Sequence, residues 1–299
     1  MSDQSWLTEI PQLDRHQLLE IRKTLDGAYR AFSREYGDNI EAFFDPLLSF
    51  LIGFEKLLLG TPWWMVIGVL AALAYVASRS WKLTVGVIVA FVLIGVFGMW
   101  DNTMRTMSII LVSTLVAIGL GVPIGIAMAR SNRVQSIVTP MLDVMQTMPA
   151  FVYLIPVVML LGIGKIPGVI AVVIYAIPPV IRLTNLGIRL VDKEVLEAAT
   201  AYGASPTQRL LGVQLPLALP NIMAGINQTI MMALAMVVIA SMIGVKGLGQ
   251  PVLKSITNQY FTLGLLNGLA IVALAIIFDR VTQSYAKRTQ QHLGGHDHG

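Results

Sequence analysis

Long apolar segments separated by short polar loops dominate this chain and set the strongest limit on its fold. A helix needs about 20 apolar residues to cross a bilayer. Segments near that length cover 62–78, 83–100, 106–129, 141–161, 167–190, 217–243 and 262–280. Only 13% of the 299 residues are charged and 55% are hydrophobic, whereas a soluble domain carries about 25% charged residues. We therefore predict an all-α integral membrane protein with about seven transmembrane helices.

Proline residues interrupt two of the predicted spans. Pro149 and Pro156 lie within 141–161. Pro178 and Pro179 lie within 167–190. A proline removes one backbone hydrogen bond and clashes with the preceding turn, so both spans are expected to be kinked.

The first 61 residues differ from the rest because charged and apolar residues alternate there at helical spacing. This pattern predicts one or two amphipathic helices, and the apolar face of 40–60 would suit the membrane surface. A solvated tail over 11–38 is an equally open alternative. Residues 1–20 contain no apolar stretch typical of a signal peptide.

Lysine and arginine residues near the span ends predict the orientation, because they favour the cytoplasmic side. Alternate loops contain Arg79, Lys82, Arg130, Arg133, Arg189, Lys193, Arg209, Lys287 and Arg288. The opposite loops contain only Arg105, Lys165, Lys246 and Lys254. We place the richer set in the cytoplasm, which puts the N-terminus outside and the C-terminus inside.

Several functions are disfavoured by what the chain contains. It has no cysteine, and its basic residues are scattered, which argues against disulfides and nucleic-acid binding. No nucleophile–base pair or metal cluster stands out, so an enzyme is the least expected class. The histidines of 296–299 lie on a tail without further ligands, so we predict disorder there rather than a metal site.

The loop 191–216, VDKEVLEAATAYGASPTQRLLGVQLP, is too polar to cross a bilayer and too patterned for a slack connection. A short helix from Asp192 to Tyr202 would end at Gly203 in the left-handed conformation. Ser205 and Pro206 can begin a second helix, with Gln208 completing a capping box. We therefore predict a rigid helix–turn–helix elbow on the cytoplasmic face.

The same loop matches the motif EAA-x₃-G-x₉-[IV]-x-LP. The matching residues are Glu197, Ala198, Ala199, Gly203, Val213, Leu215 and Pro216. This motif resembles the coupling loop of permease subunits of bacterial ABC importers. The segments 145–156, 178–191 and 226–249 resemble the permeases of glycine-betaine and proline-betaine importers, the quaternary-amine uptake family.

The resemblance implies a type I ABC importer permease fold and a domain map. The map has an extension at 1–61, two accessory helices at 62–100, a permease core at 101–285 and a flexible tail at 286–299. It further implies alternating access in a bacterial inner membrane. The implied partners are two ATPase subunits carrying ATP and Mg, a second copy of this chain and an external binding protein, which could meet the outer loop 246–251.

No phosphate-binding loop of the form G-x₄-GK-[ST] occurs in the chain. The nearest string, GIGKIP at 162–167, has Met159 in place of the first glycine and Ile166 in place of the hydroxyl residue. We therefore expect no cofactor in this chain itself and ATP hydrolysis only on the partner.

Polar and aromatic residues inside the spans are candidates for the solute route, because such groups usually face the protein interior. Aromatic faces suit a quaternary ammonium ion, which cannot donate a hydrogen bond. The candidates are Gln146, Thr147, Tyr153, Tyr175, Thr184, Asn185, Asn227, Gln228, Thr229 and Ser241. Hydrogen bonding between helices is the alternative role for each. Asp143 and Arg182 are expected to form a structural or gate-side ion pair.

Two other mechanisms stay open at this point. An ion-gradient-driven transporter usually shows internal repeats and ionisable groups at the membrane centre, and neither is evident here. An osmosensing channel would leave the elbow at 191–216 unexplained. Dependence on ATP separates the importer from both.

Overall fold

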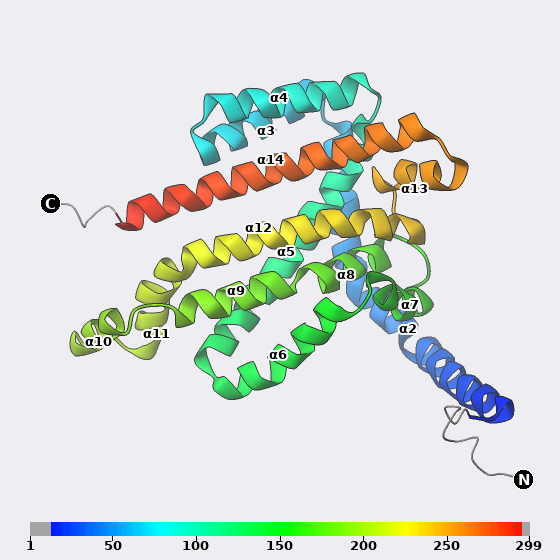
Figure 1. Cartoon of the computed structure of the whole chain (residues 1–299), viewed down its shortest axis with the longest axis horizontal. Coiled ribbons are helices and arrows are strands. Elements are labelled where there is room, and N and C mark those ends of the chain that lie inside the picture. Colours follow the sequence, from blue (N-terminus) through cyan, green and yellow to red (C-terminus); the bar gives the residue numbers. More distant parts are fainter. Residues whose placement is uncertain (1–12, 295–299) are drawn as a thin grey trace, which may run out of the picture.

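The computed structural model describes residues 13–294, with side chains up to 288, as an all-helical chain. The helices are α2 (Arg15–Gly60), α3 (Trp63–Ser78), α4 (Trp81–Val96), α5 (Trp100–Arg130), α6 (Asn132–Thr147), α7 (Ala150–Leu161), α8 (Lys165–Ala176), α9 (Pro178–Arg189), α10 (Lys193–Ala201), α11 (Pro206–Arg209), η1 (Leu210–Gln214), α12 (Leu215–Ala240), η2 (Ser241–Ile243), α13 (Gly249–Asn258) and α14 (Phe261–Gly294). Figure 1 shows α10 and α11 at the end of the bundle toward which α14 also runs, and the N-terminal helix at the other end.

Four stretches of helix in the described part are long and apolar enough to cross a membrane alone. They are Trp100–Arg130, Lys165–Arg189, Pro206–Ile243 and Phe261–Arg288. Two bent pairs, α2 with α3 and α6 with α7, raise the number to as many as six. The prediction of about seven spans is thus roughly matched, but α4 has only 16 residues. That corresponds to about 24 Å of helix, less than the hydrocarbon thickness of a bilayer.

Proline residues break the predicted span at 141–161 but leave the one at 167–190 as one continuous span. Helices α6 and α7 meet at 98°, because Pro149 forces the preceding Met148 into an extended backbone with ψ 133°. The expected kink is therefore a sharp break. At Pro178 the chain stays helical because Ile177 keeps helical angles (φ −71°, ψ −31°), and α8 continues into α9 as one span.

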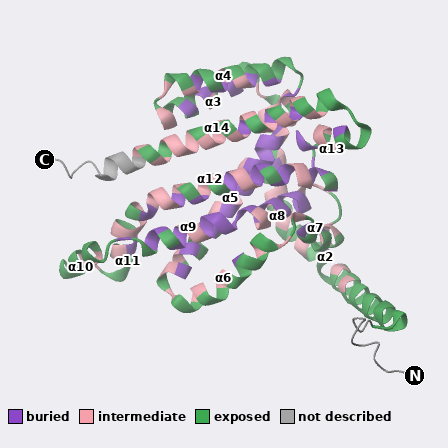
Figure 2. Cartoon of the chain, viewed as in Figure 1, coloured by how far each residue is buried: buried purple, intermediate pink, exposed green. Residues whose placement is uncertain are grey.

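The core lies where α5, α9 and α12 cross, and α12 packs most extensively on α9. Figure 2 shows the buried residues concentrated in these helices and in α8, whereas α6, α10 and α11 are largely exposed. A β-carbon on Gly125 of α5 would lie 2.6 Å from the β-carbon of Thr184 on α9. Small residues allow this approach, which is how membrane helices gain packing contacts without a hydrophobic driving force.

The N-terminal segment is one helix of 46 residues rather than two short ones. Its first part projects from the bundle (Figure 1), whereas its last part packs on α5 and buries Leu51 and Glu55. Part of 40–60 therefore packs on other helices, and contact of its exposed apolar face with the membrane surface stays a prediction. At the other terminus, α14 continues to Gly294 through the first part of the predicted tail, and 296–299 lies outside the described residues.

Candidate functional site

The first limb of the elbow, α10, begins and ends with local hydrogen bonds, as its sequence predicts. The Asp192 carboxylate accepts from the backbone N–H of Glu194 at 2.9 Å. At the other end Gly203 has φ +79°, and the N–H of Ala204 donates to the carbonyl of Ala199 at 3.0 Å. This is the Schellman arrangement, which needs a left-handed residue that glycine adopts without steric cost.

The second limb, α11, starts with the capping box expected from its sequence. The N–H of Ser205 donates to Gln208 Oε1 at 2.8 Å, and the N–H of Gln208 donates to Ser205 Oγ at 3.3 Å. Arg209 Nη1 then donates to Thr200 Oγ1 of α10 at 2.9 Å. The two limbs are therefore held at a set angle by bonds within the elbow itself.

The elbow joins the membrane helices through a π-helical turn, η1, which leads directly into α12. Leu210 of this turn is buried against Ile188 of α9 and against Ala218 and Ile222 of α12. The half-buried Leu215 packs on the same small cluster. The elbow is therefore joined to α9 and α12 by direct side-chain packing.

The outer surface of the elbow is free of other parts of the described chain. No residue of α10 is buried, and Tyr202 is 94% exposed. Glu197 and Ala198 are exposed, Ala199 is half-buried, and the Glu197 carboxylate forms no ion pair within 13–288. The surface carries few large side chains, so a partner protein could approach it closely. Two capped helices, α10 and α11, form this surface.

Arg189, at the end of α9 beside the elbow, connects three helices and was identified from sequence only as a cytoplasmic charge. Its Nη2 donates to the carbonyl of Met128 on α5 at 2.8 Å and to Asn132 Oδ1 on α6 at 2.9 Å. Its Nε donates to Asn185 Oδ1 at 3.0 Å. Asn185, a candidate route residue, is thus engaged in a contact that secures the base of the elbow.

Two of the aromatic route candidates lie together. The rings of Tyr153 on α7 and Tyr175 on α8 are edge to face with centroids 6.5 Å apart. Tyr153 is buried, and its hydroxyl donates to the carbonyls of Met145 in α6 and Met148 at the bend that follows. In this conformation the Tyr153 hydroxyl holds the α6–α7 bend, and its ring is not open to a solute.

The remaining candidates are dispersed over the bundle. Thr184 and Thr229 are completely buried, with hydroxyl oxygens that have no partner among the described residues. Asn227 Nδ2 donates to Asp279 Oδ1 on α14 at 2.8 Å, a contact between helices. Other candidates are exposed or bonded to their own helix: Gln146, Thr147, Gln228 and Ser241. Their role in a route stays a prediction.

Asp143 and Arg182 form the expected ion pair, with Nη2 2.5 Å from Oδ1. In the chain by itself the side chains of Asp143 and Arg182 are 57% and 36% exposed. Exposed pairs contribute about 0–1 kcal/mol. In a double-mutant cycle with Asp143→Asn and Arg182→Gln, we expect a coupling energy below about 1 kcal/mol in detergent melting. A larger coupling would show that the pair is shielded from water in the folded protein.

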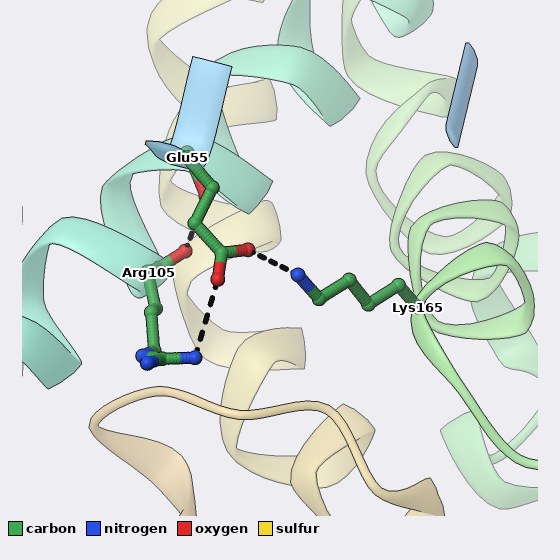
Figure 3. Close-up of polar contacts among 4 residues, drawn as sticks. Glu55, Arg105 and Lys165 are labelled. Carbon is green, nitrogen blue, oxygen red and sulfur yellow. Dashed lines mark hydrogen bonds and ion pairs between the residues drawn. The ribbon is translucent and has the colours of Figure 1, made fainter. Parts of the chain in front are cut away.

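A second ionic cluster was not foreseen from the sequence because its members are far apart along the chain. Glu55 of α2 is only 5% exposed. Its Oε1 lies 3.2 Å from Arg105 Nη1 on α5, and its Oε2 lies 2.6 Å from Lys165 Nζ on α8. Figure 3 shows the carboxylate between the two cations. One acid thus joins the N-terminal helix to two core helices.

Tyr29 and Ser33 extend this attachment along α7. Their hydroxyls donate to the carbonyls of Pro156 and Met159 near the C-terminal end of that helix. The last four carbonyls of a helix lack partners within it, so the bond from Ser33 satisfies the Met159 carbonyl, which would otherwise need another donor. The N-terminal helix is therefore attached to the bundle from Tyr29 onward, at the end opposite the elbow (Figure 1).

A bundle of long apolar helices with an exposed elbow packed on two of them is consistent with a membrane transport protein. The family of binding-protein-dependent transport system inner membrane components matches residues 121–291. The chain belongs to this family. It is a multi-pass permease component of an ABC importer.

Sequence similarity to curated permeases extends over most of the chain. It is 50% identical to the glycine betaine/proline betaine transport system permease protein ProW of Escherichia coli strain K12, over 81% of this chain and 68% of that protein. Identity is 48% to the glycine betaine/carnitine permease GbuB of Listeria monocytogenes, covering 77% of this chain and 82% of that one. It is 44% to the glycine betaine permease OpuAB of Bacillus subtilis, covering 81% and 87%.

Solved structures support the fold independently. A chain of the MetNI methionine ABC transporter, described as inward facing, superimposes with a TM-score of 0.57. The match covers 62% of this chain and 93% of that chain at 19% identity. The expected type I importer fold is therefore confirmed.

Proposed function

We propose that this chain is the permease of an ATP-driven importer for a quaternary ammonium osmolyte, such as glycine betaine or proline betaine. The structure of the elbow supports the mechanism. Its two helices are capped at three points. One side of the elbow is exposed, and the other packs on α9 and α12. The substrate class is supported by the names of relatives at 44% to 50% identity.

The elbow would dock into a separate ATPase subunit, with Glu197, Ala198 and Ala199 on the contact face. ATP and Mg would bind to that subunit, because this chain has no phosphate loop. Closure of the ATPase pair would push the elbow, and α9 and α12 would tilt with it through Leu210. Nucleotide can drive such a change only by binding one of the two conformations more tightly than the other.

The assembly would contain two copies of the permease, two ATPase subunits and a binding protein that captures the solute outside. The elbow would face the cytoplasm, and the loop at 246–251 would face the external binding protein. Tyr153 and Tyr175 would offer aromatic surface to a quaternary ammonium ion when the α6–α7 bend opens.

Uptake by the reconstituted assembly tests this function. Proteoliposomes containing the permease, its ATPase and its binding protein are supplied with radiolabelled glycine betaine. We expect uptake that needs internal ATP and persists when ionophores remove every ion gradient. Uptake that follows a sodium or proton gradient without ATP would instead support an ion-driven transporter. Competition by proline betaine, choline and carnitine would then rank the substrates.

A further inference from the structure

A groove of about 500 Å³ separates α4 from α14 on the flank of the bundle. On α4 it is lined by Lys82, Gly86 and Ala90, among others, and on α14 by Ala273, Ile277 and Arg280. In Figure 1, α3 and α4 form a hairpin along one side of α14. Because α14 packs more extensively on α3 than on α4, the second helix of the hairpin stands away from it.

One end of the groove is basic, whereas small and apolar residues line most of the rest. Lys82, Gly86 and Ala90 are four residues apart and therefore lie on one face of α4 over about 12 Å. The small residues leave the hollow, and no atom lies within 4 Å of a β-carbon placed on Gly86. Both cations, one from each helix, lie at the same end, where the α3–α4 turn and the later part of α14 meet.

These two cations have no acidic partner among the described residues. Neither Lys82 nor Arg280 forms an ion pair there, and both side chains are exposed. The neighbouring acid, Asp279, has other partners. Its Oδ1 accepts from Asn227 of α12 at 2.8 Å and from Gln283 of its own helix at 2.5 Å. The basic end of the groove therefore carries uncompensated positive charge.

We propose that the groove binds a phospholipid with an anionic headgroup. One acyl chain would lie along Gly86, Ala90 and Ala273, and the phosphate would lie between Lys82 and Arg280. Basic pockets between membrane helices attract anionic lipids in this way, and each cation adds attraction near the surface. The basic end of the groove lies toward the elbow (Figure 1). The lipid would therefore lie in the cytoplasmic leaflet. This choice of leaflet rests on the proposed function, which places the elbow in the cytoplasm.

The lipid is tested by native mass spectrometry of the full-length chain released from micelles with equal amounts of phosphatidylglycerol and phosphatidylcholine. We expect retention of one phosphatidylglycerol per chain in preference to phosphatidylcholine. The double variant Lys82→Gln with Arg280→Gln should reduce that preference by roughly 20-fold, because each cation near a membrane changes affinity about fivefold. The control, Arg133→Gln with Lys287→Gln, removes equal charge outside the groove and should bind like the wild type.

A third variant separates a lipid from a free phosphate. Gly86→Leu fills the hollow and leaves both cations in place, so it should lose phosphatidylglycerol but keep any binding of soluble glycerol phosphate. Equal retention of both lipids by the wild type, or unchanged retention in the double variant and in Gly86→Leu, would overturn the proposal. The measurement needs no ATPase, so its failure would leave the proposed import function intact.

Discussion

Replacing Gly203 with aspartate is expected to weaken the association of this chain with its ATPase subunit by about tenfold or more. The substitution places a charge at the C-terminal end of α10, where the helix dipole disfavours an anion by about 0.3–1 kcal/mol. It also places that charge beside the face that we propose to dock, where an unpaired charge buried on binding adds a larger cost. Co-purification in mild detergent, with quantitative mass spectrometry of the ATPase, measures the loss.

Gly203→Asn is the matched control because asparagine has nearly the shape of aspartate and also tolerates the left-handed conformation. A β-carbon on Gly203 meets no atom within 4 Å, so neither side chain collides with the elbow. We expect the asparagine variant to retain most of the ATPase and the aspartate variant to lose it while still folding in the membrane. Full, coupled uptake by the aspartate variant would remove the docking assignment.

Replacing Glu55 with glutamine is expected to lower the stability of the folded chain by about 3 kcal/mol. Removing one partner of a buried ion pair usually costs about 3–5 kcal/mol, because the other charge is left unpaired. Here the lower figure applies, since Arg105 and Lys165 retain 28% and 27% side-chain exposure. For a chain of this size the loss corresponds to a melting temperature lower by roughly 6–12 °C, which thermal unfolding in detergent can measure.

Two controls separate the cluster from a general effect of charge. Glu41→Gln removes an exposed acid from the same helix and should leave the melting temperature within about 2 °C, since surface substitutions rarely exceed about 0.5 kcal/mol. The triple variant Glu55→Leu, Arg105→Met, Lys165→Met removes all three charges and should recover most of the stability, because apolar replacement of a complete buried pair is often neutral. A glutamine variant as stable as the wild type would show that α2 is only loosely attached.

The parts of the site that could be predicted from sequence are those made by neighbouring residues. The ends of α10 and α11 follow from Asp192, Gly203, Ser205 and Gln208. Asp192, Ser205 and Gln208 form capping bonds with residues two or three positions away. Gly203 adopts the left-handed conformation that allows the backbone bonds at the end of α10. Such bonds depend little on the rest of the fold. The membrane class likewise follows from continuous apolar segments of about 20 residues, which are read directly along the chain.

The route candidates show where the same reasoning stops. Polarity inside a span indicates that a side chain faces protein, but it does not select between a solute path and a neighbouring helix. Asn227 and Asn185 are each bonded to another side chain, whereas Thr184 and Thr229 are buried without a partner. Only the positions of the surrounding helices make that distinction.

By itself, the sequence determined the helical membrane class, the capped elbow and its resemblance to a permease coupling loop, because each rests on composition or on contacts a few residues apart. The tertiary structure alone decided that Glu55 meets Arg105 and Lys165, 50 and 110 residues further along the chain. It also decided the 98° break between α6 and α7 and the groove beside α14. Contacts over such separations depend on how whole helices pack, which local periodicity does not specify.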